Sequence, residues 1–376
     1  MKISVLQENL AKALSIVGKA VEARPQLPVL ANVLLQAEGS QLMVAATNLQ
    51  MSITMWIGAK ITEPGSITLP AKTFVDLVNN LSPERVDLTL DTDTHTMLVR
   101  CGATKSNIKG IDADEFPPIM HHDNPDLLIE GGVLRSMINQ TAFAAAQEEN
   151  RPILTGVYTE VEGEAITMAA ADGYRLALRT GKLNASYAGE KVSIVVPAKT
   201  LMEVARSIEE SDLEIGIALP QKRDIATFIL PNLHISSQLL DGRFPDFSAI
   251  IPKAYVTQTV MYTDDLLRAC KRAEIFARDS ANSGRLYVKP ANGPSEPGEV
   301  MVVGKSAERG DNEGLVDASV EGEALDISFN IKYLIDVLRV IDEERVVFQS
   351  NGTENPGVIR PENREDFVHV IMPMSR

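Results

Sequence analysis

Cysteine, tryptophan and long apolar runs are scarce in this sequence of 376 residues. The two cysteines, Cys101 and Cys270, lie far apart, so we expect neither a disulfide framework nor a cysteine metal cluster, and a reducing compartment fits. No window approaches about 18 uncharged apolar residues, so no membrane-spanning helix is predicted. The first residues, MKISVLQENLAKAL, carry scattered charges and no apolar run of signal-peptide length. We therefore expect a cytoplasmic protein without a membrane partner.

Positive charge is also in short supply. The chain has 36 Lys and Arg against 51 Asp and Glu, which gives a formal net charge of −15 and a pI near 4.9. Taken alone, this balance argues against a nucleic-acid partner, because basic patches carry that affinity. Net charge is an average over the surface, however, and an acidic exterior can coexist with a locally basic face.

Recognisable catalytic motifs are missing. Residues 298–306 read GEVMVVGKS, but five residues separate the glycines where a phosphate loop requires four, and the segment alternates like a strand. His121, His122 and Asp123 form the only histidine cluster, in a predicted linker and without the helical spacing of metal sites. No Ser or Cys sits in a nucleophile elbow. We predict a protein that is not an enzyme and that needs no cofactor or metal.

One segment occurs three times, at 69–90, 196–217 and 329–350. In the first copy Phe74, Leu77, Val78 and Leu81 follow the i, i+3, i+4, i+7 spacing of one helix face. A polar turn follows, and then apolar residues alternate with polar ones, as in a half-buried strand. The helix faces of the other copies are Leu201, Val204, Ala205 and Ile208, and Leu334, Val337, Leu338 and Ile341. Repetition on this scale predicts duplicated domains.

The predicted fold class is α+β, with three tandem similar domains at 1–120, 127–251 and 254–376. Each domain is expected to contain two helices and about eight short strands in hairpins. Alternating strands favour antiparallel sheets with one buried face. Two segments rich in Pro, Gly and Glu, 289–299 and 351–365, are predicted to be loops.

A lysine recurs at one position of the repeated helix, as Lys72, Lys199 and Lys332. A cation in the first turn opposes the helix dipole, at a cost of a few tenths to ~1 kcal/mol. An acidic residue four positions on is expected to offset part of that cost: Asp76, Glu203 and Asp336. Two interpretations remain open: a solvated face inherited by duplication, or three lysines presented to a shared polyanion.

Several motifs resemble those of one family. Besides the three repeated helices, the chain has DGYRLA at 172–177, DGRFPDF at 241–247 and VIMPM at 370–374. Together they closely resemble the bacterial DNA sliding clamps, the β subunits of DNA polymerase III. The resemblance implies a head-to-tail homodimer that closes a six-domain ring around double-stranded DNA, without sequence preference. It also implies that short peptides of the replicative polymerase and the clamp loader bind the ring, which catalyses nothing.

The basic residues fit this interpretation, because eleven of them fall on the two helices of each repeat that a ring would turn inward. These are Lys12, Lys19, Lys72, Arg135, Lys199, Arg206, Arg268, Lys271, Arg272, Lys332 and Arg339. Scattered cations that contact only phosphate give sequence-independent binding. By resemblance, Arg24 and the loop at Arg151 would also contact DNA.

The resemblance implies a partner-peptide pocket between the second and third domains. Its residues are Leu154, Ala171, Gly173, Tyr174, Arg175, Leu176, Pro245, Ile250, Val370, Met372, Pro373 and Met374. Methionine is adaptable and suits a surface that accepts several ligands. Tyr174, Ala249 and Ser375 depart from the usual family pattern. The alternative is an ordinary turn beside a frayed terminal strand.

For the dimer, the resemblance implies contact between Lys105 and Ile108 of one chain and Ile275 and Phe276 of the other. Pairing would cover apolar residues at an exposed edge; the alternative is that these residues belong to the core. Two further classes of function stay open. One is an acidic, non-catalytic scaffold with a small-molecule cleft between its domains, and the other is a hydrolase whose site carries no familiar motif.

Overall fold

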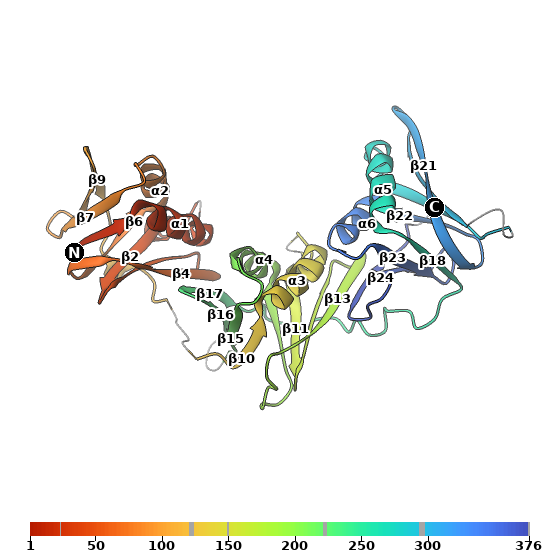
Figure 1. Ribbon diagram of the computed structural model, residues 1–376, viewed down its shortest axis with the longest axis horizontal. Coiled ribbons are helices and arrows are strands. Elements are labelled where there is room, and N and C mark those ends of the chain that lie inside the picture. Colours follow the sequence, from red (N-terminus) through yellow and green to blue (C-terminus); the bar gives the residue numbers. More distant parts are fainter. Residues whose placement is uncertain (23, 120–123, 149, 221–223, 293–297, 375–376) are drawn as a thin grey trace. The chain divides into compact units, whose positions relative to one another are not determined.

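The computed structural model describes residues 1–376 apart from 23, 120–123, 149, 221–223, 293–297 and 375–376 (Figure 1). The described chain forms two compact units. The first unit is Met1–Gly132 with Arg206–Leu239, and the second unit is Val133–Ala205 with Leu240–Arg376. The middle repeat therefore contributes strands to both units. The histidine cluster at 121–123 lies outside the described residues.

The elements of the first repeat alternate strands with two helices. They are β1 (Lys2–Leu6), α1 (Gln7–Val17), η1 (Gly18–Ala20), η2 (Pro28–Ala31), β2 (Asn32–Glu38), β3 (Gln41–Thr47), β4 (Met51–Gly58), β5 (Lys60–Glu63), β6 (Gly65–Pro70), α2 (Ala71–Asn79), β7 (Arg85–Asp91), β8 (Thr96–Cys101), β9 (Thr104–Lys109) and η3 (Ala113–Glu115).

Among the described residues, the second repeat has the same order of elements except that it lacks counterparts of β5 and η3. Its elements are β10 (Leu127–Glu130), α3 (Gly131–Thr141), η4 (Ala142–Ala144), η5 (Pro152–Thr155), β11 (Gly156–Glu162), β12 (Ala165–Ala171), β13 (Arg175–Lys182), β14 (Val192–Pro197), α4 (Ala198–Ser207), β15 (Glu214–Ala218), β16 (Ile225–Leu230) and β17 (Leu233–Gln238).

The third repeat lacks the short 3-10 turns among its described residues. Its elements are β18 (Thr257–Tyr262), α5 (Thr263–Ala277), β19 (Ser283–Lys289), β20 (Glu299–Ser306), β21 (Gly310–Gly322), β22 (Leu325–Asn330), α6 (Ile331–Leu338), β23 (Arg345–Ser350), β24 (Gly357–Pro361) and β25 (Phe367–Ile371).

The first unit contains a five-stranded sheet, ordered β5-β1-β7-β8-β9, and an eight-stranded sheet, ordered β10-β15-β16-β17-β4-β3-β2-β6. The eight-stranded sheet combines two repeats, because β17 of the second repeat pairs antiparallel with β4 of the first, with Ser237 opposite Met51 and Leu233 opposite Met55. The connection between these repeats is therefore a continuous ladder of backbone hydrogen bonds.

The second unit contains one twelve-stranded sheet, ordered β14-β11-β12-β13-β25-β24-β23-β18-β21-β20-β19-β22. Here β25 of the third repeat pairs antiparallel with β13 of the second, with Ile371 opposite Arg175 and Phe367 opposite Arg179. Strand β25 thus holds the same place as β17 in the first unit, and β13 the same place as β4.

The helices pack through the faces that the repeat predicts. In α2 the side chains of Ala71, Phe74 and Val78 are buried, and the apolar faces of α4 and α6 are buried along their whole length. Helix α1 packs against α2, and α5 packs against α6 (Figure 1). Burial of a large apolar side chain contributes about 1.5–3 kcal/mol, so these faces fix the helices on their sheets.

One local expectation was wrong. The segment 351–365 is not all loop, because β24 pairs with β23 and β25 inside it. The segments 28–38 and 152–162 each begin with a 3-10 turn, opened by Pro28 and Pro152, and continue as strands β2 and β11. The segment 298–306 is the strand β20, as its alternation indicated.

Candidate functional site

The predicted DNA-contacting residues are nearly all exposed. Within the described residues, Arg135 on α3 is half-buried, and every other member of the set lies on the surface. The helical members lie on α1, α2, α4, α5 and α6, while Lys19 lies in η1 and Arg339 directly follows α6. Arg24 and Arg151 lie in exposed loops. Every described member of the set is thus at least partly accessible.

The three repeated lysines occupy one structural position. Lys72, Lys199 and Lys332 are each the second residue of α2, α4 and α6, and each is exposed. In α6 the Asn330 side chain caps the helix by accepting a hydrogen bond from the Lys332 backbone N–H at 3.1 Å. Among the described residues, none of the three lysines forms an ion pair, so all three charges face solvent.

The predicted offset by Asp336 is wrong. Its carboxylate accepts a hydrogen bond from Arg175 Nη1 at 2.7 Å and is not paired with Lys332. Ion pairs on the surface include those of Lys12 with Glu209 at 2.8 Å and of Arg268 with Asp265 at 2.5 Å. Exposed pairs of this kind contribute about 0–1 kcal/mol, so phosphate can compete for both cations.

The predicted partner-peptide residues all lie in the second unit. Most of them lie around the turn between β12 and β13 and at the end of β25, whereas Leu154 lies in η5 and Pro245 and Ile250 lie in the segment between β17 and β18. Asp172 Oδ1 accepts hydrogen bonds from the backbone N–H of Tyr174 and of Arg175, at 2.9 and 3.0 Å. Gly173 has φ 93°, a conformation that favours glycine. The Met372 N–H donates to the Tyr174 carbonyl at 2.8 Å, so the chain terminus is tied to this turn.

Apolar contacts bring further members of the predicted set together. Leu154 lies in one buried cluster, with Phe244, which is not in the set, and Leu176 and Val370 lie in another. Ala171 packs against both clusters. Tyr174, Ile250 and Met372 remain exposed beside this core, with Tyr174 at 66% and Met372 at 41%. Exposed apolar side chains on a buried apolar base are typical of an interaction surface.

Arg175 is the best-connected residue of this region. Its side chain is buried, and it donates to Asp172 Oδ2 at 3.0 Å, to Asp336 Oδ2 at 2.7 Å and to the Phe143 carbonyl at 2.8 Å. Its guanidinium also lies 4.3 Å from the centre of the Tyr333 ring. The planar fork of arginine suits such multiple contacts. Arg175 thereby links the β12–β13 turn to α6, the helix that carries Lys332.

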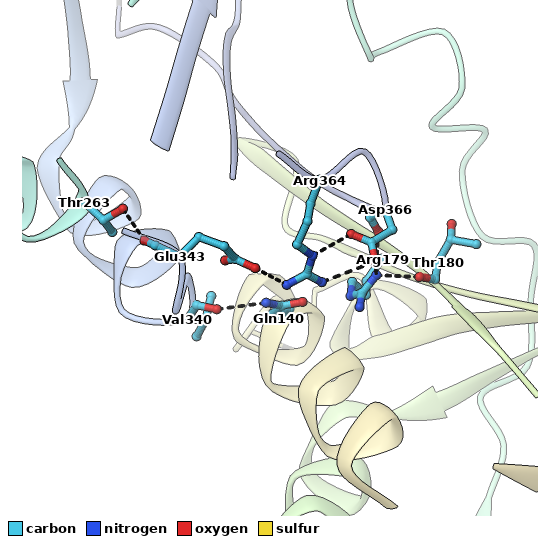
Figure 2. Close-up of polar contacts among 8 residues, drawn as sticks. All are labelled: Gln140, Arg179, Thr180, Thr263, Val340, Glu343, Arg364 and Asp366. Carbon is cyan, nitrogen blue, oxygen red and sulfur yellow. Dashed lines mark hydrogen bonds and ion pairs between the residues drawn. The ribbon is translucent and has the colours of Figure 1, made fainter. Parts of the chain in front are cut away.

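A second polar network joins the two repeats within this unit (Figure 2). Arg364 contacts Glu343 and donates from Nε to Asp366 Oδ1 at 2.9 Å, while Arg179 pairs with the other Asp366 oxygen. Burial pushes the pKa of Asp366 upward, but the hydrogen bonds and charges of Arg364 and Arg179 outweigh burial and hold the pKa below its ordinary value. Gln140 also donates to the Val340 carbonyl at 3.0 Å.

The sequence does not reveal the partners in these networks. Asp336 looks like one more solvated carboxylate on a helix, and Phe143 and Tyr333 look like core residues. Only the fold brings them to Arg175. Position 336 does not stand out in the sequence, because the equivalent positions 76 and 203 also carry a carboxylate.

The predicted dimer residues differ in exposure. Ile275 on α5 is 50% exposed and Lys105 on β9 is exposed, whereas Phe276 is half-buried. Ile108 is buried in its own unit, opposite Met97 on β8. The expectation of an exposed apolar side chain is therefore wrong for Ile108, because that side chain already serves the core.

The described residues contain no group of three or more His, Cys, Asp or Glu side chains arranged to hold a metal ion. None of the described helices is long and apolar enough to cross a membrane.

Three tandem α+β domains, joined by continuous antiparallel sheets and bearing exposed cations on equivalent helices, define a DNA-clamp fold. Family models agree along the chain: the N-terminal domain of the DNA polymerase III beta subunit matches 1–120, its central domain 128–246 and its C-terminal domain 248–375. The chain belongs to the DNA polymerase III beta subunit family, the beta sliding clamps. Its function is accordingly that of a DNA polymerase processivity factor.

Individual relatives support the same assignment. The beta sliding clamps of Bacillus subtilis and Pseudomonas aeruginosa are each 31% identical to this chain; the alignments cover all of this chain and 99% and 100% of theirs. The crystal structure of the Bacillus subtilis clamp matches with a TM-score of 0.93 at 30% identity, over 100% of this chain and 99% of that chain. A Pseudomonas aeruginosa clamp bound to griselimycin matches with a TM-score of 0.91 at 30% identity, with both chains fully covered.

Proposed function

We propose that two copies of this chain close head to tail into a ring of six domains that encircles duplex DNA. The ring would hold the replicative polymerase and the clamp loader through the partner-peptide site and would catalyse no reaction itself. We place this activity in the cytosol, where the free thiols of Cys101 and Cys270 are stable. The domains would span 1–120, 127–251 and 254–376, which the ranges of the family models support.

The observation that carries the proposal is the recurrence of one exposed lysine on three equivalent helices. Lys72, Lys199 and Lys332 are exposed in a chain with a net charge of −15. Cations repeated by domain duplication suit a ligand that is itself a repeating polyanion. Acidic residues over the rest of the surface would discourage DNA from binding elsewhere. Phosphate contacts alone would let the duplex pass without being read.

The order of the strands supports the ring. At both junctions between repeats, the fourth strand of one repeat pairs with the last strand of the next repeat. These pairs are β4 with β17 and β13 with β25. In the third repeat β21 holds the place of β4 and β13, and in the first repeat β9 holds the place of β17 and β25. Within the described residues β9 ends its sheet, and β21 pairs over Gly310–Asp317 with β20 alone. A second copy would satisfy both edges, and two equivalent contacts would close the ring.

Retention on circular DNA tests the proposal. The protein, loaded by its clamp loader onto a nicked circle, is expected to remain bound through extended washing and to leave when the circle is cut. A linearised template with blocked ends serves as the control and should retain the protein. If the protein stays bound after the circle is cut to give free ends, the proposal that the protein encircles DNA is wrong.

A further inference from the structure

An open groove lies on the first unit, away from every residue assigned above. Its volume is about 760 Å³, and its walls are strands β2, β3 and β4 on one side and the segment 113–119 on the other. Leu34, Met43, Phe116 and Ile119 provide apolar surface, and Trp56, the only tryptophan of the chain, lines one side. Ligand sites in proteins typically enclose about 300–1,000 Å³, so the groove has the size of a binding site.

The equivalent region of the second repeat is filled by the protein itself. Leu34 pairs with Ala45 and Thr68, and its counterpart Tyr158 pairs with Ala169 and Val195 in the same register.

The segment that follows is also equivalent, because Phe116-Pro117 corresponds to Phe244-Pro245 and Ile119 corresponds to Phe247. In the second repeat the ring of Tyr158 lies 5.5 Å from that of Phe244 and 5.6 Å from that of Phe247. In the first repeat the aliphatic Leu34 and Ile119 pack with Phe116 at the equivalent positions, and all three border the groove. Two aromatic rings of the second repeat are thus replaced by smaller aliphatic side chains beside the groove.

The charged residue that lines the groove is acidic, and acidic residues flank its second wall. Glu38 lines it, and Asp112, Asp114 and Glu115 are exposed on the segment that forms its second wall. None of the described residues that line the groove is Lys or Arg. Gln36 and Gln41 add hydrogen-bonding groups. A ligand that contacts both the apolar floor of the groove and the carboxylates at 112–115 has to extend beyond the groove itself. This requirement favours a peptide segment over a small molecule.

We propose that this groove docks an extended segment of a partner protein that carries aromatic and basic side chains. The aromatic side chain would occupy the space that Tyr158 and Phe247 fill in the second repeat, against Phe116 and Trp56. The basic side chains would face Glu38 and the carboxylates at 112–115. Buried aromatic anchors surrounded by complementary charge supply most of the affinity in such interfaces. The groove is separate from the partner-peptide site, whose residues all lie in the second unit.

Trp56 makes the proposal directly measurable, since all tryptophan fluorescence of the protein arises in the groove. The probe is the peptide acetyl-Lys-Phe-Lys-Phe-Lys-amide, and the matched control is acetyl-Glu-Phe-Glu-Phe-Glu-amide. We expect the basic peptide to change the Trp56 emission saturably, and the acidic peptide to leave it unchanged. The proposal fails if the basic peptide gives no saturable change at millimolar concentration, or if the acidic peptide binds equally well.

Two variants test the assignment of the residues. The double variant Leu34→Tyr/Ile119→Phe copies the side chains of the second repeat and should weaken binding at least tenfold. Glu38→Gln removes one exposed charge, leaves the core untouched and should weaken binding about threefold, with a shallower salt dependence. Unchanged affinity in Glu38→Gln refutes the electrostatic part even if the double variant does not fold. If phenylalaninamide binds as tightly as the peptide, the groove is a small-molecule site and the docking proposal is wrong.

Discussion

At the scale of single residues, Arg175 joins the partner-peptide turn to α6. We expect Arg175→Met to lower the free energy of unfolding by about 2–3 kcal/mol. The substitution leaves the carboxylates of Asp172 and of the partly exposed Asp336 without their cationic partner. Affinity for polymerase peptides should fall as well, because Arg175 orders the turn that carries Tyr174. Urea unfolding and peptide titration measure the two effects.

Arg285 provides the matched control for that substitution. It forms a two-point contact with Asp326, at 2.6 and 2.5 Å, but both side chains are more than 30% exposed. Arg285→Met should therefore cost less than ~1 kcal/mol and leave peptide affinity unchanged. Equal losses in the two variants would show that Arg175 has no special structural role.

His369 gives the molecule an acid-sensitive position. It is fully buried on β25 beside the Phe143 ring, and burial, reinforced by the charge of Arg175, lowers its pKa from 6.5 to about 3. The folded protein therefore holds this imidazole neutral, while the unfolded chain takes up a proton below about pH 6.5. Stability from this residue is complete above that pH and is lost as the pH falls toward 3.

The variant His369→Leu isolates the effect. Between pH 7.5 and 5 the contribution of His369 should fall by about 2 kcal/mol, since one pKa unit is equivalent to about 1.4 kcal/mol. The variant should lose correspondingly less stability than the parent over this interval, as measured by urea unfolding at both pH values. If the free energy of unfolding falls equally in the two proteins between pH 7.5 and 5, His369 is already accessible to protons in the folded state.

At the scale of elements, the repeated helices invite a test of the lysines as a set. Replacing Lys72, Lys199 and Lys332 with Ala should weaken binding to linear duplex DNA and flatten its salt dependence. Removal of one phosphate-binding cation reduces the slope of log K against log salt by about 0.9. The measurement is fluorescence anisotropy of a labelled duplex at several salt concentrations.

A control with the same change in charge uses exposed lysines on strands, one in each repeat: Lys60 on β5, Lys182 on β13 and Lys305 on β20. Their replacement with Ala should leave the slope nearly unchanged. If both sets reduce it equally, net charge governs DNA binding, and the placement of lysines on the helices does not.

Elements built on a repeated pattern were the most predictable part of this fold. The apolar faces of α2, α4 and α6 and the strands after them were predicted by spacing alone, because periodic burial appears directly in the sequence. Strand β24 was missed because its segment is rich in Pro, Gly and Glu, and only pairing with β23 and β25 makes it a strand. The partners of Arg175 were missed for a related reason, since interactions between residues about 160 positions apart depend on the fold.

At the scale of the whole molecule, the repetition includes the junctions between the domains as well as the three domains themselves. Each junction between repeats uses the same pair of strand positions, so the fold repeats its connections as well as its parts. In the proposed ring, β9 of one copy and the Gly310–Asp317 part of β21 of another would be the two halves of one more junction. Extending the internal pattern by a second copy would close that ring.

The dimer contact gives the last prediction. Ile275 on α5 and Leu315 on β21 are 50% and 59% exposed, and α5 packs on β21 (Figure 1). The double variant Ile275→Arg/Leu315→Arg places unpaired charge in the proposed interface, which should weaken the dimer at least about 100-fold, equivalent to about 2.7 kcal/mol. Leu27→Arg, at a 51% exposed leucine of the first unit, is the control. Sedimentation should find monomers for the double variant and dimers for the parent protein and the control. Peptide binding by the double variant should be unchanged. If the double variant remains dimeric, the chains do not pair through β21.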